Sequence, residues 1–174
     1  MQNKKESFLF IKNKNHTPFS KKNKNKKMKK LVIGCDHAGF PYKDAIIDFV
    51  KEKGYLIEDK GTFSLESVDY PDFAHQVAQS IVNKNADLGI LLCGSGNGVS
   101  ITANKYAAVR AALCWEVELA VLARQHNDAN ILSIPVRFVT LEKALHMLEA
   151  FLNTDFEGGR HQNRVNKINA CSIN

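Results

Sequence analysis

The chain has 174 residues, of which 44% are hydrophobic and 24% are charged, as expected for one globular domain with a sizeable core. No apolar run approaches the ~20 residues that cross a bilayer, so we expect no membrane association. The four cysteines (35, 93, 114 and 171) form no Cys-x-x-Cys pair and no secretion signal accompanies them. These features exclude a zinc ribbon and a disulfide scaffold, and they predict a reducing, cytoplasmic location.

The charge is unevenly distributed along the chain. Residues 1–30 hold eleven Lys and one Glu (+10), whereas the remaining 144 residues hold 13 basic and 17 acidic groups (−4), which together give the net +6. We predict a disordered Lys/Asn-rich extension at 1–28, followed by a domain at 29–174. A nucleic-acid-binding arm is the alternative. A solvated tail, or an upstream start codon with Met28 as a second initiator, is the simpler interpretation, so we expect no nucleic-acid partner.

From residue 31 onward, short β-branched or Leu-rich runs alternate with longer amphipathic segments. Pro41 suits the first turn of a helix that Gly54 ends, and Phe73, Val77 and Ile81 recur at helical spacing. The predicted strands are 31–35, 55–58, 88–93, 109–113 and 131–134. The predicted helices are 41–53, 71–83, 99–106, 117–125 and 141–152. This repeated alternation predicts an α/β fold with a parallel sheet covered by helices on both faces.

The loops after the first, third and fifth strands are predicted to meet at the carboxyl edge of that sheet, where ligands bind in such folds. The first loop carries Asp36 and His37, which suit hydrogen bonds to a polyol. Capping of the next helix by Asp36 is the structural alternative, and neither interpretation is favoured by the sequence alone. Arg137 follows the fifth strand at the same edge.

The loop after the third strand is the most informative segment. It reads Gly94, Ser95, Gly96, Asn97, Gly98, and it directly follows Cys93. Alternating glycines allow several backbone N–H groups to point into one concavity that favours an anion. Although most cysteines are inert core residues, this one is a candidate base, and a following helix N-terminus is expected to lower the pKa of its thiol.

Two further polar segments are candidates for binding and proton transfer. His126 and Asn127 lie at a helix end before the fifth strand, where a histidine suits proton transfer near neutral pH. Arg160 and Arg164 follow Gly158-Gly159, and in a helix they share one face with His161 beside them. Two guanidiniums on one face favour a phosphate site over a merely solvated basic face.

Together these residues suit proton transfer next to the carbonyl of a phosphorylated sugar. No metal-ligand spacing and no Walker lysine is present, so we expect neither a metal nor a nucleotide. A base would remove the C2 proton of an open-chain aldose, and the loop amides would stabilise the resulting enediolate oxygen. The same base would return the proton to C1. No cofactor is required, because the electrons stay within the substrate.

Six motifs across residues 29–168 closely resemble the ribose-5-phosphate isomerase B family: Cys35-Asp-His-Ala-Gly39, Asp69-Tyr-Pro71, Cys93-Gly-Ser-Gly-Asn-Gly98, Ala103-Asn-Lys105, Arg124-Gln-His-Asn-Asp128 and Gly158-Gly-Arg-His-Gln162 with Arg164. The resemblance implies a Rossmann-like three-layer α/β/α sandwich with a five-stranded parallel sheet. It also implies interconversion of D-ribose 5-phosphate and D-ribulose 5-phosphate in the pentose phosphate pathway.

The resemblance also implies roles for individual residues. Cys93 matches the proton-transferring base and His126 the acid/base that opens the furanose ring. Substrate and phosphate contacts are implied for Asp36, His37, Gly94, Ser95, Gly96, Asn97, Gly98, Asn127, Arg137, Arg160 and Arg164. The family forms homodimers or homotetramers with the cleft between subunits, so His126 and the arginines would complete a neighbour's site.

The chain departs from the family in three places. Val99 stands where some relatives have a Glu base, Ser133-Ile-Pro-Val136 precedes Arg137 where a Gly is common, and the basic extension has no counterpart. Two alternatives stay open. A hexose 6-phosphate such as allose or galactose 6-phosphate is the competing substrate, and a non-catalytic sugar-phosphate-binding protein is less favoured because Cys93 and His126 are both present.

Overall fold

The computed structural model describes residues 28–169, so almost all of the predicted extension 1–28 and also Cys171 lie outside the described part. Strands and helices alternate as expected. The strands are β1 (Lys30–Cys35), β2 (Leu56–Asp59), β3 (Leu88–Cys93), β4 (Ala111–Leu113) and β5 (Ile131–Pro135). The helices are α1 (Phe40–Glu52), α2 (Tyr70–Val82), α3 (Asn97–Ala103), α4 (Val117–Asn127), α5 (Leu141–Asn153) and α6 (Arg160–Asn169).

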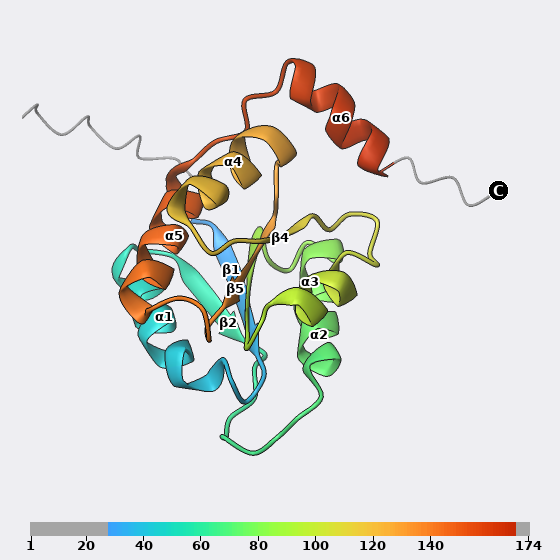
Figure 1. The fold of residues 1–174 in the computed structure, drawn as a ribbon. Coiled ribbons are helices and arrows are strands. Elements are labelled where there is room, and N and C mark those ends of the chain that lie inside the picture. The colour runs from blue at the N-terminus through green and yellow to red at the C-terminus, as the bar shows by residue number, and fades with distance from the viewer. Residues whose placement is uncertain (1–27, 170–174) are drawn as a thin grey trace, which may run out of the picture.

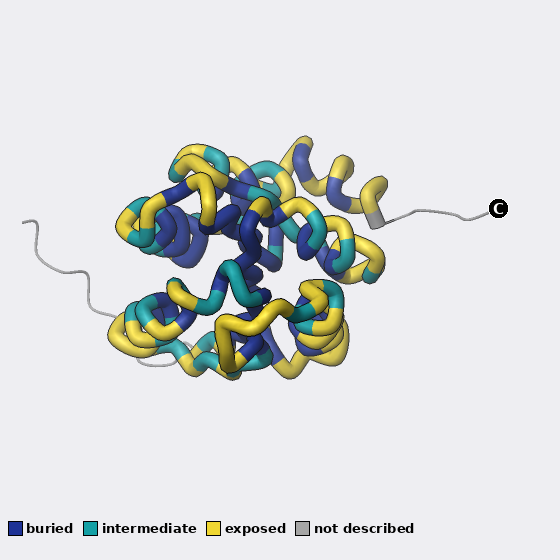
Figure 2. Tube along the Cα trace, turned by 60° about the horizontal axis from the view of Figure 1, so that its bottom comes forward, coloured by how far each residue is buried: buried dark blue, intermediate teal, exposed yellow. Residues whose placement is uncertain are grey.

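The five strands form one parallel sheet in the order β2-β1-β3-β5-β4, which confirms the predicted architecture. Helices α1, α4 and α5 pack on one face of the sheet, and α2 and α3 pack on the other (Figure 1). Every residue of β3 and β5 is buried, as expected for central strands covered on both faces. The buried sheet between two more exposed helical layers is visible in Figure 2.

The sheet order places a topological switch point between β1 and β3. The chain leaves β1 toward β2 on one side, whereas the connections after β3 lead to β5 and β4 on the other. The loops that follow β1 and β3 therefore diverge and leave a crevice at the carboxyl edge, the usual ligand position in open parallel sheets. Cys35 pairs with Leu92, so Asp36 and Cys93 end neighbouring strands at almost the same level.

Several predicted boundaries were wrong, each for a local reason. Helix α3 begins at residue 97 rather than 99, because Gly96, with φ 72°, turns the chain directly into the helix. Strand β4 begins at residue 111 rather than 109, because the N–H of Arg110 donates to the side chain of Asn130 instead of a strand carbonyl. Helix α4 extends to residue 127, so His126 and Asn127 lie on its last turn.

A buried lysine braces the carboxyl edge. The side chain of Lys43 on α1 is 2% exposed, and its ammonium contacts the Asp59 carboxylate at 2.7 Å and the Thr62 carbonyl at 2.8 Å. The Phe63 ring covers the same ammonium, with its centroid 4.1 Å away. These contacts fix the start of the 60–69 loop against the β1 end. No helix within residues 28–169 has both the length and the apolarity needed to cross a membrane.

Candidate active site

Cys93 and Asp36 lie beside one another at the carboxyl edge. Cys93 ends β3, is 6% exposed and directly precedes the glycine loop, and Asp36 follows the neighbouring strand β1 at almost the same level. Asp36 is 5% exposed, and its carboxylate accepts the N–H of Gly39 at 2.9 Å. Helix α1 has Gly39 at its N-cap and no side-chain cap hydrogen bond, so Asp36 does not cap this helix, and its carboxylate holds the turn between β1 and α1 instead. The sulfur faces loop amides and a carboxylate, which is a polar environment on the edge of an apolar core.

The sequence predicted a lowered pKa for the Cys93 thiol, and this direction was wrong. Burial raises the pKa of the thiol above its ordinary value, and the neighbouring Asp36 carboxyl raises it further through its hydrogen bond and its charge. Hydrogen bonds from Gly96 and Ser95 lower the pKa, but they do not offset the burial. In the isolated chain these surroundings therefore favour the protonated thiol.

The glycine loop is shaped by close packing. Gly96 has φ 72°, a conformation that favours glycine, and a Cβ there would lie 2.5 Å from Leu113. A Cβ on Gly98 would lie 2.4 Å from the Tyr70 ring, so the phenol at the start of α2 covers this glycine. A Cβ on Gly94 would lie 3.1 Å from the Arg137 guanidinium. Arg137 therefore lies against the loop, at the edge where the sequence placed it.

The remaining carboxyl-edge residues surround an open groove. His37 accepts the N–H of Val68 at its Nδ1, 3.4 Å away, and so connects the β1 end to the 60–69 loop. A groove beside the glycine loop is lined by Ser95, Asn97, Leu113, Trp115, Glu116, Pro135 and Phe138. Val99, the position at which some relatives have a glutamate, is buried in the core and offers no base.

His126 lies at the opposite edge of the sheet, together with the phosphate candidates. It precedes β5, whose first residue pairs with Gly89, whereas Cys93 pairs with the last residue of β5. Four residues of strand separate these two levels, or about 13 Å along the sheet. Asn127, Arg160 and Arg164 accompany His126 at this amino edge. One chain therefore does not bring its thiol and His126 together.

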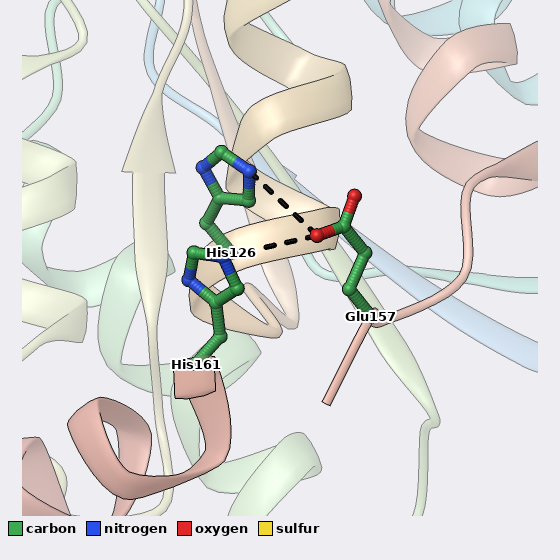
Figure 3. A group of neighbouring side chains, drawn as sticks. All are labelled: His126, Glu157 and His161. Carbon is green, nitrogen blue, oxygen red and sulfur yellow. Dashed lines mark ion pairs between the residues drawn. The ribbon is translucent and has the colours of Figure 1, made fainter. Parts of the chain in front are cut away.

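At the amino edge the His126 ring stacks on the His161 ring with centroids 4.1 Å apart and an interplanar angle of 2° (Figure 3). Glu157 faces both rings: its Oε2 lies 3.9 Å from the Nε2 of His126 and 3.7 Å from the Nε2 of His161. The backbone N–H of Glu157 donates to the carbonyl of Gln125 at 3.1 Å, which fixes this segment to the last turn of α4.

The arginines lie on α6, the helix predicted after the two glycines. Gly158 and Gly159 have φ 66° and 53°, and they turn the chain into this helix, which stands out from the body in Figure 1. Arg160 donates to the Nε2 of His161 at 3.4 Å, and an Arg164 nitrogen lies 3.3 Å from its Nδ1. Burial lowers the pKa of His161, and the neighbouring His126 and both arginines lower it further. This imidazole is therefore neutral.

The two histidines and Glu157 form the one group in residues 28–169 that could hold a metal ion, with ligand atoms within 4.8 Å of one another. Their geometry is poor for that purpose, because parallel stacked rings cannot both direct a lone pair at one ion. Two guanidiniums beside His161 also repel a dication. The cluster is better suited to holding protons and an anion.

Other residues have structural positions. Burial raises the pKa of Cys35 and of Cys114 to about 12, as expected for inert core thiols. Arg110 forms an ion pair with Asp128 at 2.8 Å and so has a structural role. Asp69 occupies the N-cap of α2 without a side-chain cap hydrogen bond. Glu157 was not anticipated, because an exposed acidic residue before two glycines carries no sequence signal.

The chain has an α/β fold with one five-stranded parallel sheet, and its candidate site residues lie at two opposite edges of that sheet. The Ribose/Galactose Isomerase family matches residues 31–168, which is most of the chain, and the chain belongs to this family.

Individual relatives extend the similarity. Ribose-5-phosphate isomerase B of Escherichia coli (strain K12) is 49% identical over 143 residues, which cover 82% of this chain and 96% of the relative. A crystal structure of ribose 5-phosphate isomerase from Thermotoga maritima is 50% identical, with a TM-score of 0.79 over 81% of this chain and 97% of that one. The Mycoplasma genitalium ribose-5-phosphate isomerase B, solved with bound ribulose-5-phosphate, is 43% identical, with a TM-score of 0.77 over 80% of this chain and 93% of that one.

Proposed function

We propose that this protein is a cytoplasmic aldose–ketose isomerase that interconverts D-ribose 5-phosphate and D-ribulose 5-phosphate in the pentose phosphate pathway. The observation that carries the proposal is the position of the buried Cys93 at the end of β3, beside Asp36 and directly before the glycine loop, at the β1–β3 switch point. The relatives named for this activity cover nearly the whole described domain and support the assignment.

The carboxyl edge would carry out proton transfer between C1 and C2. The Cys93 thiolate removes the C2 proton of the open-chain aldose and returns it to C1, while the hydroxyl proton moves from O2 to O1. The loop amides at 94–98 stabilise the enediolate oxygen, and one such donor contributes roughly 3–4 kcal/mol to the barrier reduction. Asp36 lies beside the thiol, where it can accept the thiol proton and contact a sugar hydroxyl.

The amino edge would bind the cyclic substrate and open its ring. His126 moves the proton that ring opening requires, and Arg160 and Arg164 bind the phosphate dianion. Neither guanidinium has a carboxylate within ion-pair distance in residues 28–169. Their present contact is His161, a weaker partner than a phosphate, so both are available for substrate.

The separation of the two edges supports a homodimer, or a homotetramer built from such dimers, with the cleft between copies. A two-fold axis can bring the amino edge of one copy to the carboxyl edge of the other, and it generates two equal sites at once. Trp115 is 50% exposed and Phe138 is 73% exposed beside the glycine loop, as expected for apolar residues that a second copy covers.

A hexose 6-phosphate is the second candidate substrate, because the family description also includes galactose isomerases. The two candidate substrates differ by one carbon, so the distance between the proposed phosphate-binding residues Arg160 and Arg164 and the thiol of Cys93 decides between them. That distance is set by how two copies meet.

Turnover measured with the purified full chain tests the proposal. We expect ribose 5-phosphate to be converted to ribulose 5-phosphate with a kcat/KM at least about a hundredfold above that for allose 6-phosphate or galactose 6-phosphate. A preference for either hexose phosphate would reassign the substrate. Binding of ribose 5-phosphate without turnover would favour the non-catalytic alternative.

A further inference from the structure

The carboxylate of Glu157 is out of place at a phosphate site. It lies next to His161, which both Arg160 and Arg164 contact, and the Glu157 side chain is 50% exposed. A negative charge at this position repels a phosphate dianion and weakens substrate binding. Because this carboxylate weakens phosphate binding, we expect it to have a role in the proton transfer at the same edge.

We propose that Glu157 is a positioning residue for His126, and that it holds the proton of this imidazole on Nε2 so that Nδ1 acts during ring opening. This inference rests on the proposed function. His161 contributes by fixing the plane of the His126 ring.

Two histidines face Glu157, and the contacts indicate that His126 is the one whose proton Glu157 positions. His161 also faces the carboxylate, but its Nε2 accepts a hydrogen bond from Arg160 and its pKa is lowered, so it carries no proton on that nitrogen. The Nε2 of His126 has no such competing donor in residues 28–169 and faces Oε2 of Glu157 across 3.9 Å. Figure 3 shows that the other ring nitrogen of His126 points away from the carboxylate.

Stacking on the His161 ring restricts the rotation of the His126 imidazole. His161 is 5% exposed and is held between two guanidinium groups, so it forms a fixed plate 4.1 Å from the His126 ring. The backbone N–H of Glu157 is anchored to Gln125 on the same turn that carries His126. The backbone of Glu157 and the ring of His126 are therefore both held at the last turn of α4, with the carboxylate within ion-pair distance of the imidazole before substrate arrives.

The proton balance of ring opening fits this arrangement. The bond between C1 and the ring oxygen breaks, the C1 hydroxyl loses its proton and the ring oxygen gains one. With Nε2–H directed at Glu157, the free Nδ1 of His126 takes the hydroxyl proton and then delivers it to the ring oxygen. The carboxylate stabilises the imidazolium that exists between the two transfers.

The test separates ring opening from proton transfer by comparing the turnover of ribose 5-phosphate with the exchange of the C1 proton of ribulose 5-phosphate for solvent deuterium. Ribulose 5-phosphate has no furanose form, because its C5 oxygen carries the phosphate. In Glu157→Gln we expect kcat/KM for ribose 5-phosphate to fall about tenfold to a hundredfold. The exchange into ribulose 5-phosphate, which needs no ring opening, should change less than about twofold. Inhibition by inorganic phosphate should tighten about two- to fivefold, the range for a half-exposed charge.

Matched controls keep the result specific. Glu149→Gln removes another surface carboxylate, paired with Lys53 on a different part of the chain, and should leave turnover, exchange and phosphate inhibition unchanged. Adding Glu157→Gln to His126→Asn should cause no further loss, because a positioning residue acts only through its partner.

An equal loss in ribose 5-phosphate turnover and in ribulose 5-phosphate exchange, weaker phosphate inhibition, or full additivity with His126→Asn would overturn the proposal. If Glu157→Gln fails to fold, ¹⁵N NMR of histidine-labelled wild type decides instead: His126 should carry its proton on Nε2, and an Nδ1–H tautomer contradicts us. A wild type that does not turn over ribose 5-phosphate would refute the proposed function itself, which is a separate outcome.

Discussion

The two edges of the sheet differ in how they are built. At the carboxyl edge, Cys93 and Asp36 are almost fully buried, and the polar groups around the thiol are largely backbone amides fixed by the strands. At the amino edge, His126 is 36% exposed at the side chain and Glu157 is 50% exposed, and charged side chains predominate. One edge is a rigid, desolvated pocket, and the other is a charged surface open to solvent.

The difference indicates a division of labour. Abstraction of a carbon-bound proton needs a desolvated base and fixed hydrogen-bond donors, whereas phosphate capture and ring opening need mobile charged groups that meet a solvated substrate. Each copy would supply the first kind of half-site to one cleft and the second kind to another. The following predictions test whether the two edges are separable in this way.

The largest effect should come from removing the thiol. Cys93→Ala should lower kcat at least about a thousandfold in both directions, because no other base reaches the C2 proton. Steady-state assays with ribose 5-phosphate and ribulose 5-phosphate measure it, with circular dichroism to verify folding. Cys114→Ala is the matched control, since burial raises the pKa of that thiol to about 12 and its loss should leave kcat nearly unchanged. Near-normal turnover by folded Cys93→Ala would remove the proposed base.

A smaller loss should follow from adding one methyl group to the glycine loop. The Cβ of Gly98→Ala would overlap the Tyr70 ring at 2.4 Å and displace the loop, and we expect kcat to fall about a hundredfold. In a Tyr70→Ala background the methyl group has room, so the same substitution should then cost less than about tenfold. Equal losses in both backgrounds would show that the clash is not the cause.

The smallest effect concerns pH and distinguishes the buried edge from the exposed one. Burial, and then Asp36, raise the pKa of the Cys93 thiol, and the thiolate is the active form. The rate should therefore rise with pH, by about tenfold per unit below that pKa. Asp36→Asn removes a charge that favours the protonated thiol, so this limb of the kcat/KM profile should move to lower pH. A shift to higher pH would contradict the assignment.

How much the sequence revealed also differs between the edges. Cys93 ends a buried strand, and Asp36 and Gly94 directly follow two such strands, so the parallel topology alone placed the three residues together. The raised pKa of Cys93 could not be predicted, because its burial depends on how α2 and α3 cover β3. His126 was recognised from its residue type and from a family resemblance. His126 lies before strand β5 in the sequence. Once β5 is known to belong to the parallel sheet, this position places His126 at the amino edge, opposite to Cys93.

The central claim is that one active site takes its base from one copy and its ring-opening histidine from another. Mixing Cys93→Ala with His126→Asn during refolding or co-expression tests this most directly, with ribose 5-phosphate as substrate. Random dimers should recover about one quarter of wild-type activity, because half are hybrids with one intact site of two. A mixture no more active than the sum of the separate variants would contradict a shared site and place both residues in the same copy's cleft.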